Sequence, residues 1–162
     1  MAVDMFIKID DVKGESQDAK YKEWIDILAW SWGVSQEGTF HRGGGGGSGK
    51  ASMTDLSVTK WVDRASPNLM KYCASGKQYK EAKLVVRKAG GKEPLEYLVV
   101  NLKDVIVTSY NTGGGGGEEK LTENIALNFA QISVDYQQQK PDGSKEGGPV
   151  KFGWNIAQNK EA

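Results

Sequence analysis

Apolar and polar positions alternate with a period of two along most of the chain. In VDMFIKI (3–9), every second residue starting from Val3 is apolar, which is the pattern of a strand with one buried face. Similar patterns predict further strands at residues 23–35, 52–63, 82–90, 94–110, 121–139 and 150–159. GGKE (90–93) joins two of these long patterns and predicts a hairpin between them.

Two of these strand patterns depart from simple alternation. In residues 23–35, Trp30 and Trp32 lie on one face and Ile25 and Ile27 on the other, so both faces are partly apolar. A strand of this kind usually meets a second sheet or another subunit, because a solvated face would be polar. In residues 121–139 the apolar phase slips near Ala130, which predicts a bulge or a sharp bend.

One segment has the signals of a helix. In SPNLMKYCASG (66–76), Ser66 stands where an N-cap is expected, Pro67 occupies the first helical position, and Gly76 follows the last turn. Cys73 belongs to the apolar stripe of this helix, so we interpret it as a core thiol and not as a nucleophile. The pattern as a whole predicts a mainly β protein, an antiparallel β-barrel or sandwich with one flanking α-helix, in a single domain over residues 1–162.

Composition narrows the class of partner. The 162 residues include 21 Lys and Arg against 21 Asp and Glu, so no overall field attracts the chain to nucleic acid or to an anionic membrane. The sequence has one cysteine, which excludes an intramolecular disulfide, and no apolar run long enough for membrane insertion. The start of the chain carries no signal for general secretion.

A glycine-rich stretch, GGGGGSGKA (43–51), raises the question of a phosphate-binding loop. Gly44, Gly49 and Lys50 fit the spacing G-x-x-x-x-G-K. However, Ala51 replaces the residue that holds Mg²⁺, and the nearest hydroxyl, on Ser52, comes one residue too late. The next segment has the pattern of a strand and not of the required helix. A nucleotide-binding protein that uses GGGGGSGK is therefore kept as a disfavoured alternative, and equilibrium dialysis with labelled ATP and Mg²⁺ would test it.

Other catalytic chemistry is sparse. His41 is the only histidine, and one histidine without cysteines or ordered carboxylates does not form a zinc site. The adjacent carboxylates Asp10 and Asp11 would point to opposite faces of a strand, so they do not form an acid–base pair. We assign no catalytic residue, no cofactor and no metal, and we interpret the chain as a non-enzyme.

The two glycine tracts, Gly43 to Gly47 and Gly113 to Gly117, remain open to two interpretations. Taken alone, each is a flexible surface loop. Five consecutive glycines are costly to order, and that cost is offset only where a loop adapts to a partner. This second interpretation favours assembly over catalysis.

Five stretches together carry a resemblance to a known family. They are DMFIKIDDVKGES (4–16), IDILAWSWGVSQ (25–36), SPNLMKYCASGK (66–77), LTENIALNFAQISVDYQ (121–137) and GWNI (153–156). With these motifs the chain resembles, over nearly its whole length, the Hcp family, the haemolysin-coregulated proteins of the bacterial type VI secretion system.

The resemblance implies a structural role. Its members form rings of six subunits that stack into a hollow inner tube within a contractile sheath, tipped by a VgrG spike, and they carry small effector proteins in the lumen. The protein would be made in the cytoplasm and expelled by the apparatus without a signal peptide. Some members carry a C-terminal effector domain, for which a chain ending at Ala162 has no room. A phage tail-tube protein is the structural alternative, and gene neighbourhood would separate the two.

Two surfaces are assigned on this basis. Ser31 is predicted to line the lumen, because it lies with Ala29 and Gly33 on the face of the 23–35 strand that has small residues. The loop around the first glycine tract lacks apolar residues and resembles the extended interface loop of the family. The predicted subunit contacts are His41, Arg42, Gly43, Gly44, Gly45, Gly46, Gly47 and Ser48.

Overall fold

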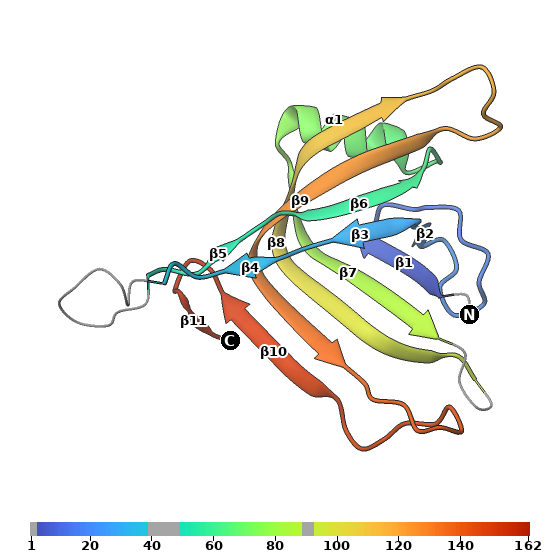
Figure 1. Cartoon of the computed structure of the whole chain (residues 1–162). Coiled ribbons are helices and arrows are strands. Elements are labelled where there is room, and N and C mark those ends of the chain that lie inside the picture. The colour runs from blue at the N-terminus through green and yellow to red at the C-terminus, as the bar shows by residue number, and fades with distance from the viewer. Residues whose placement is uncertain (1–2, 39–48, 89–92) are drawn as a thin grey trace.

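The chain folds mainly as antiparallel β-structure. The computed structural model describes residues 3–38, 49–88 and 93–162 (Figure 1). Within these residues the elements are β1 (Asp4–Ile9), β2 (Ile25–Asp26), β3 (Ala29–Ser31), β4 (Val34–Ser35), β5 (Ser52–Met53), β6 (Leu56–Trp61), α1 (Ser66–Ser75), β7 (Gln78–Lys88), β8 (Leu95–Gly113), β9 (Thr122–Tyr136), β10 (Val150–Asn155) and β11 (Lys160–Glu161).

A ring of backbone pairings closes the main sheet into a barrel. Antiparallel neighbours follow in the order β1, β7, β8, β9 and β6. Segment 25–31 closes the ring, because β2 pairs with β1 and β3 pairs with β6. Between the two, the Ile27 N–H donates to the Met5 carbonyl at 3.1 Å and the Leu28 N–H donates to the Thr59 carbonyl at 2.7 Å. The predicted β-barrel with one flanking helix is confirmed.

Strand β9 changes both its partner and its inward face half-way along. Its first half pairs with β6 and its second half with β10, while β8 runs along the whole length. The inward positions are odd-numbered as far as Phe129, and Ile132 is the next fully buried residue. On the facing strand, Asp104 takes a left-handed backbone with φ 54°. The change of inward face near Ala130 is thus confirmed, and it lets one strand serve two parts of the sheet. The β8–β9 register shifts between Val107 and Ser109, opposite Leu127 and Ala126, so this irregularity lies before the position at which the sequence predicted a bulge.

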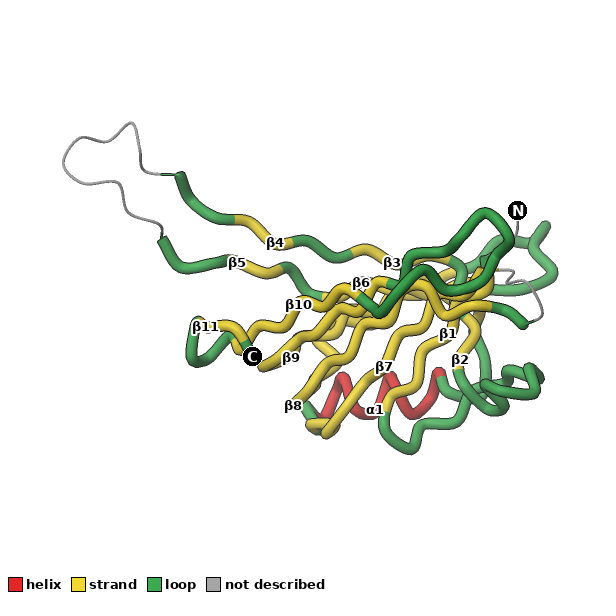
Figure 2. Tube along the Cα trace, turned by 90° about the horizontal axis from the view of Figure 1, so that it is seen from below, coloured by secondary structure: helices red, strands yellow, loops and turns green. Residues whose placement is uncertain are grey.

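The helix closes one end of the barrel core. In Figure 2 it lies across the strands on one side of the molecule. Leu69 is fully buried, and Tyr72 and Cys73 pack against the core while partly exposed. The Tyr72 ring meets the Tyr79 ring edge-on at 5.1 Å between centroids. The interpretation of Cys73 as a core thiol agrees with this packing.

A strap formed by residues 13–24 covers part of the outer face of β1 and β7. Tyr21 stacks on Phe6 at 4.7 Å between ring centroids, and both pack with Val85 in a second small core. Arg87 lies over the same two rings and binds Asp18 at 2.5 Å. The hydrogen bonds from Arg87 lower the pKa of Asp18. A segment that reads as a polar loop is therefore packed and fixed by charge.

A network of charged and polar groups is buried between the helix and the barrel. The side chains of Lys60 and Glu123 are both 0% exposed and form an ion pair. Asp63 binds the same ammonium group at 2.9 Å, and the Ser66 and Tyr110 hydroxyls donate to the carboxylate of Glu123. Burial and the hydrogen bond to Glu123 raise the pKa of Tyr110 to about 12, so its hydroxyl stays a donor.

The prediction that Ser66 is the helix N-cap is wrong. The N-cap is Ala65, which makes no side-chain cap hydrogen bond, and Ser66 is the first helical residue. The Ser66 hydroxyl instead accepts from the Asp63 N–H at 2.9 Å and donates to Glu123 at 2.8 Å. The Ser66 side chain points into the buried polar network and does not cap the helix. The predicted end of the helix is confirmed, since Gly76 has φ 69°.

We expect Ser66→Ala to lower the free energy of unfolding by about 1–3 kcal/mol, because it removes a bridging hydroxyl and leaves buried partners unsatisfied. Urea denaturation followed by circular dichroism measures the change. Ser75→Ala, at the exposed end of the same helix, is the control and should shift the midpoint little. Equal midpoints for both variants would contradict a structural role for the Ser66 hydroxyl.

Candidate subunit interface

The apolar inner face of the sheet extends past the closed core. Across β8, β9 and β10 the paired rows are Leu98–Tyr136–Val150, Val100–Val134–Phe152 and Leu102–Ile132–Trp154. Exposure rises from about zero at Ile132 to 39% at Phe152, 45% at Tyr136 and 70% at Val150. We call these three exposed residues the apolar face. Contiguous exposed apolar surface on a soluble domain marks a site of protein contact.

A two-stranded arm stands beside the apolar face. We define the arm as the described residues 32–38 and 49–55, which contain β4 and β5 and extend away from the barrel (Figures 1 and 2). Val34 pairs with Met53, and the Gly33 and Thr54 backbones are hydrogen-bonded. Trp32 and Met53 pack on the core, but the Val34 side chain is exposed. A two-stranded hairpin is only marginally stable in water by itself.

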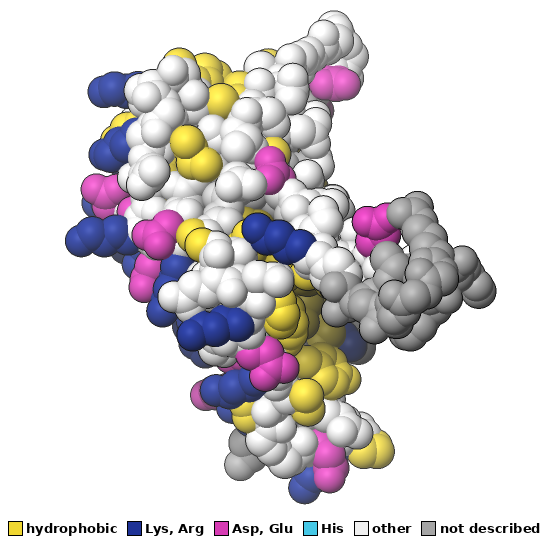
Figure 3. All heavy atoms as spheres, turned by 90° about the vertical axis from the view of Figure 1, so that its left-hand side faces the viewer, with side chains coloured by type: hydrophobic (Ala, Val, Ile, Leu, Met, Phe, Trp, Pro, Cys, Tyr) yellow, Lys and Arg dark blue, Asp and Glu magenta, His cyan; other side chains and the backbone are white. Residues whose placement is uncertain are grey.

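The base of the arm and the apolar face are in contact. The rings of Trp32 and Phe152 lie 6.4 Å apart between centroids. Figure 3, which views the molecule from the side of the arm, shows hydrophobic side chains gathered in a hollow of this surface. The arm of the chain leaves Val150 uncovered. The molecule therefore presents a projecting arm and, next to it, an apolar face that is still open.

The predicted contact loop lies, in the sequence, between the two described stems of this arm. Residues 41–48, from His41 to Ser48, fall outside the described residues, so their assignment to subunit contacts stays a prediction. The described stems on either side of residues 39–48 belong to the arm.

Ser31 lies on an open polar face of the barrel. It is exposed and directly opposite Ser57, as Ala29 is opposite Thr59. The Thr59 hydroxyl donates to the Asn124 side-chain oxygen at 2.6 Å. This outer face of β3, β6 and β9 carries small side chains, several of them polar. It is the small-residue face on which the sequence placed Ser31.

Comparison with known proteins identifies the family. The family model described as "Type VI secretion system effector, Hcp" matches residues 6–136. The chain belongs to the Hcp family. It is 64% identical to protein hcp1 of Pseudomonas aeruginosa over the full length of both chains.

Solved structures of other members have the same fold as this Hcp chain. One, titled as the structure of a type six secretion system protein, is 33% identical with a TM-score of 0.93, over 99% of this chain and 100% of the other. Hcp1 from Salmonella typhimurium is 41% identical with a TM-score of 0.82, over the full length of both. The resemblance inferred from the five sequence stretches is confirmed.

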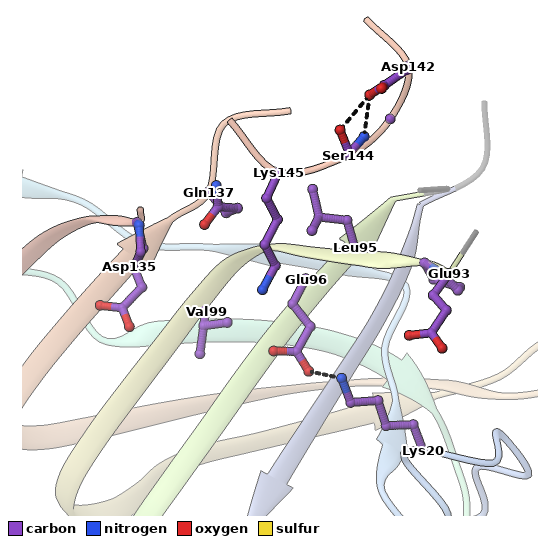
Figure 4. Close-up of a pocket in the computed structure, with 13 residues that line it drawn as sticks. Lys20, Glu93, Leu95, Glu96, Val99, Asp135, Gln137, Asp142, Ser144 and Lys145 are labelled. Atoms are coloured by element: carbon purple, nitrogen blue, oxygen red, sulfur yellow. Dashed lines mark hydrogen bonds and ion pairs between the residues drawn. The ribbon is translucent and has the colours of Figure 1, made fainter. Parts of the chain in front are cut away.

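A groove with a volume of about 730 Å³ lies between the start of β8 and the loop after β9 (Figure 4). Burial opposes ionisation of Glu96, but the Tyr21 hydroxyl and Lys20, at 3.1 Å, outweigh it and lower its pKa. The Ser144 hydrogen bonds lower the pKa of Asp142. Two carboxylates held in the charged form by partners are poor general acids or bases at neutral pH.

The other chemical candidates also have structural partners. After Lys50 the Hcp chain continues into β5 and β6, so the helix that a phosphate-binding loop needs is replaced by strands. The Asp10 carboxylate accepts the backbone N–H groups of Lys80 and Glu81. Among the described residues, no cluster of His, Cys, Asp and Glu is arranged to hold a metal ion. In the same ranges, no helix has the length and apolar character needed to span a membrane.

Sequence reasoning missed the apolar face. Val150 and Phe152 alternate with polar residues, which is the pattern of an ordinary buried strand, and nothing local says that β10 lies outside the closed barrel. The signal that was available is the phase slip at Ala130. It changes which residues of the second half of β9 share a face with Phe152 and Val150 of the paired strand β10.

We expect Val150→Asp to weaken self-association strongly without destabilising the monomer. Val150 is 70% exposed in a single chain, but a carboxylate buried there by a second copy would be unpaired and costly. Size-exclusion chromatography with light scattering measures the assembly. Val62→Asp is the control, because Val62 is 40% exposed and lies away from the arm. Equal assembly of the two variants would exclude Val150 from the interface.

Proposed function

We propose that this Hcp chain is the structural subunit of the inner tube of a type VI secretion system. Copies join into a ring of six, and rings stack into a hollow tube. The observation that carries this proposal is the combination of a projecting arm and an uncovered apolar face on one chain. Two different surfaces that meet between copies form a heterologous contact, which closes into a ring when the rotation between copies is a whole fraction of a turn. The number six comes from the family.

The partners follow from the same assignment. The tube lies within a contractile sheath and is tipped by a VgrG spike, and sheath contraction expels it from the cytoplasm. The open polar face around Ser31 faces the lumen, where small effector proteins are carried. A wall of small side chains offers few strong contacts, so a passenger can be held and later released. The proposed role is structural and requires no catalysis.

Deleting Gly44 to Gly47 tests the arm. The barrel should melt at nearly its usual temperature, because shortening a surface loop by half changes its closure entropy by only about 0.6 kcal/mol. Contacts made by the arm would be lost at every interface of a ring at once. Light scattering should therefore show smaller species in place of rings, and export in an active strain should stop. If the deletion variant still forms rings of full size, the glycine tract makes no essential subunit contact.

Replacing Ser31 by tryptophan tests the lumen separately. A bulky ring on the wall would block the approach of a passenger, so Ser31→Trp should reduce capture of an effector in pull-down assays. Six-fold rings should persist in negative-stain micrographs, because Ser31 is not part of the apolar face or the arm. Unchanged capture by intact rings would place Ser31 elsewhere. Thr59→Ser, on the same face, is the control for a change that adds no bulk.

A further inference from the structure

Hydrophobic packing alone does not distinguish the observed register of β6 on β9 from one shifted by two residues. A shift by one residue would turn the apolar side of a strand outward, which burial forbids. A shift by two residues keeps the alternation. In the observed register, Val58 faces Ile125 and Leu56 faces Leu127. After a shift of two, Val58 faces Leu127, and one aliphatic side chain has replaced another.

The side chains on the outer face of β6 and β9 also distinguish the two registers only partly. Ser57 faces Ala126 and Thr59 faces Asn124 in the observed register. A shift of two places Thr59 opposite Ala126, loses the hydrogen bond between Thr59 and Asn124, and separates Asp55 from Asn128, whose amide donates to the Asp55 carboxylate at 2.9 Å. Exposed hydrogen bonds contribute on the order of 1 kcal/mol each. The outer face therefore favours the observed register only moderately.

The buried ion pair is the feature that depends strongly on register. Lys60 and Glu123 are direct neighbours across the two strands, and both are completely buried. After a shift of two, Lys60 would face Ile125 and Glu123 would face Val62. Glu123 would then be buried without a cation, which is among the most costly changes in a protein core. Lys60 would keep Asp63, three residues further along its own segment.

The groups around this pair extend the same constraint to other elements. The Glu123 carboxylate takes hydrogen bonds from Tyr110 on β8 and from Ser66 on α1. The Lys60 ammonium also binds Asp63, in the connection between β6 and the helix. The contacts of Glu123 with Lys60 and Ser66 form in one register of β6 against β9. The pair of charges thus aligns β6, and with it the start of the helix, on β9.

We propose that the Lys60–Glu123 pair is a register lock, which selects one alignment of β6 on β9 and adds little to the net stability of the fold. A buried pair is often no more stabilising than apolar side chains of similar size, because burying both charges costs as much as their attraction returns. The choice of register is a separate quantity. It depends on the free-energy difference between the observed register, in which the charges are paired, and the shifted one, in which they are separated. The proposal concerns a single chain and holds whether or not the chain forms rings.

The test compares the parent chain with a variant in which the lock is apolar. The variant is Lys60→Met, Glu123→Leu, Tyr110→Phe and Asp63→Asn together. The last two changes are included because the Tyr110 hydroxyl would otherwise lose its acceptor and the Asp63 carboxylate its ammonium partner. Both proteins carry Cys73→Ser, which removes the native thiol. Thr59→Cys with Asn124→Cys reports the observed register, since these positions are directly opposite. Thr59→Cys with Ala126→Cys reports the shifted register, because disulfides need neighbouring Cβ atoms.

In the parent, oxidation followed by mass spectrometry should link the first cysteine pair and leave the second near background. In the apolar variant, linkage of the second pair should rise by about tenfold or more, because the penalty on buried unpaired charges is gone. The melting temperature of the variant should equal or exceed that of the parent. Val58→Ile with Ile125→Val, which exchanges two facing aliphatic residues, is the control and should change neither measurement.

Two results would overturn the proposal. If the apolar variant links only the first cysteine pair, packing alone sets the register and no lock is needed. If the variant melts far below the parent or does not fold, the pair is a stabilising interaction and not a selective one.

Discussion

The continuous pairing of β9 with β8 is the constraint on which the rest of the structure depends. These two strands stay together over almost their full length, while the other edge of β9 passes from β6 to β10. One half of the pair therefore belongs to the closed barrel and the other half carries β10 outside it. The apolar face arises because the sheet continues after the barrel has closed. Closure of the barrel buries the core. The apolar face on β9 and β10 lies outside the closed barrel and stays open for contact.

The polar network and the apolar face involve different halves of β9 and have different roles. Near Glu123, the inner side of β9 carries charge that demands particular partners. Beyond Ala130, its inner side leads to aliphatic and aromatic groups whose contacts are less particular in direction. The first half is thus suited to fixing the geometry within one chain. The second half is suited to association, where apolar area supplies most of the driving force.

The features of the fold that depend on neighbouring residues in the chain could be predicted from the sequence. Alternation located the long strands, the phase slip at Ala130 located the change of face, and Gly76 ended the helix. Long-range pairing was not accessible in this way. Lys60 occupies an inward position between Val58 and Val62, and Glu123 shares the inward phase of Ile125, but only the β6–β9 register brings the two together. The same unknown pairing hid the role of Ser66, because a hydroxyl before Pro67 has the ordinary appearance of a cap.

The resemblance to the Hcp family supplied what local patterns lacked, and it rested on several ordered stretches and not on one motif. The candidate site was only partly accessible. Small residues beside Ser31 indicated an open face, and the structure shows that face. The arm was divided in the sequence between two predicted strands, because nothing near Trp32 or Met53 indicates that their hairpin leaves the barrel. Its glycine tract falls outside the described residues.

The way segment 25–31 closes the barrel has a kinetic consequence. The ring of strands is joined there by short pairings on two different neighbours, whereas β8 and β9 are joined by a ladder of more than ten residue pairs. Amide protons exchange through the opening that costs least, so the seam should exchange with solvent long before the β8–β9 ladder does. The first step of unfolding is then a barrel that becomes an open, curled sheet with most of its core intact. The seam is therefore the place where the shape of the barrel yields first.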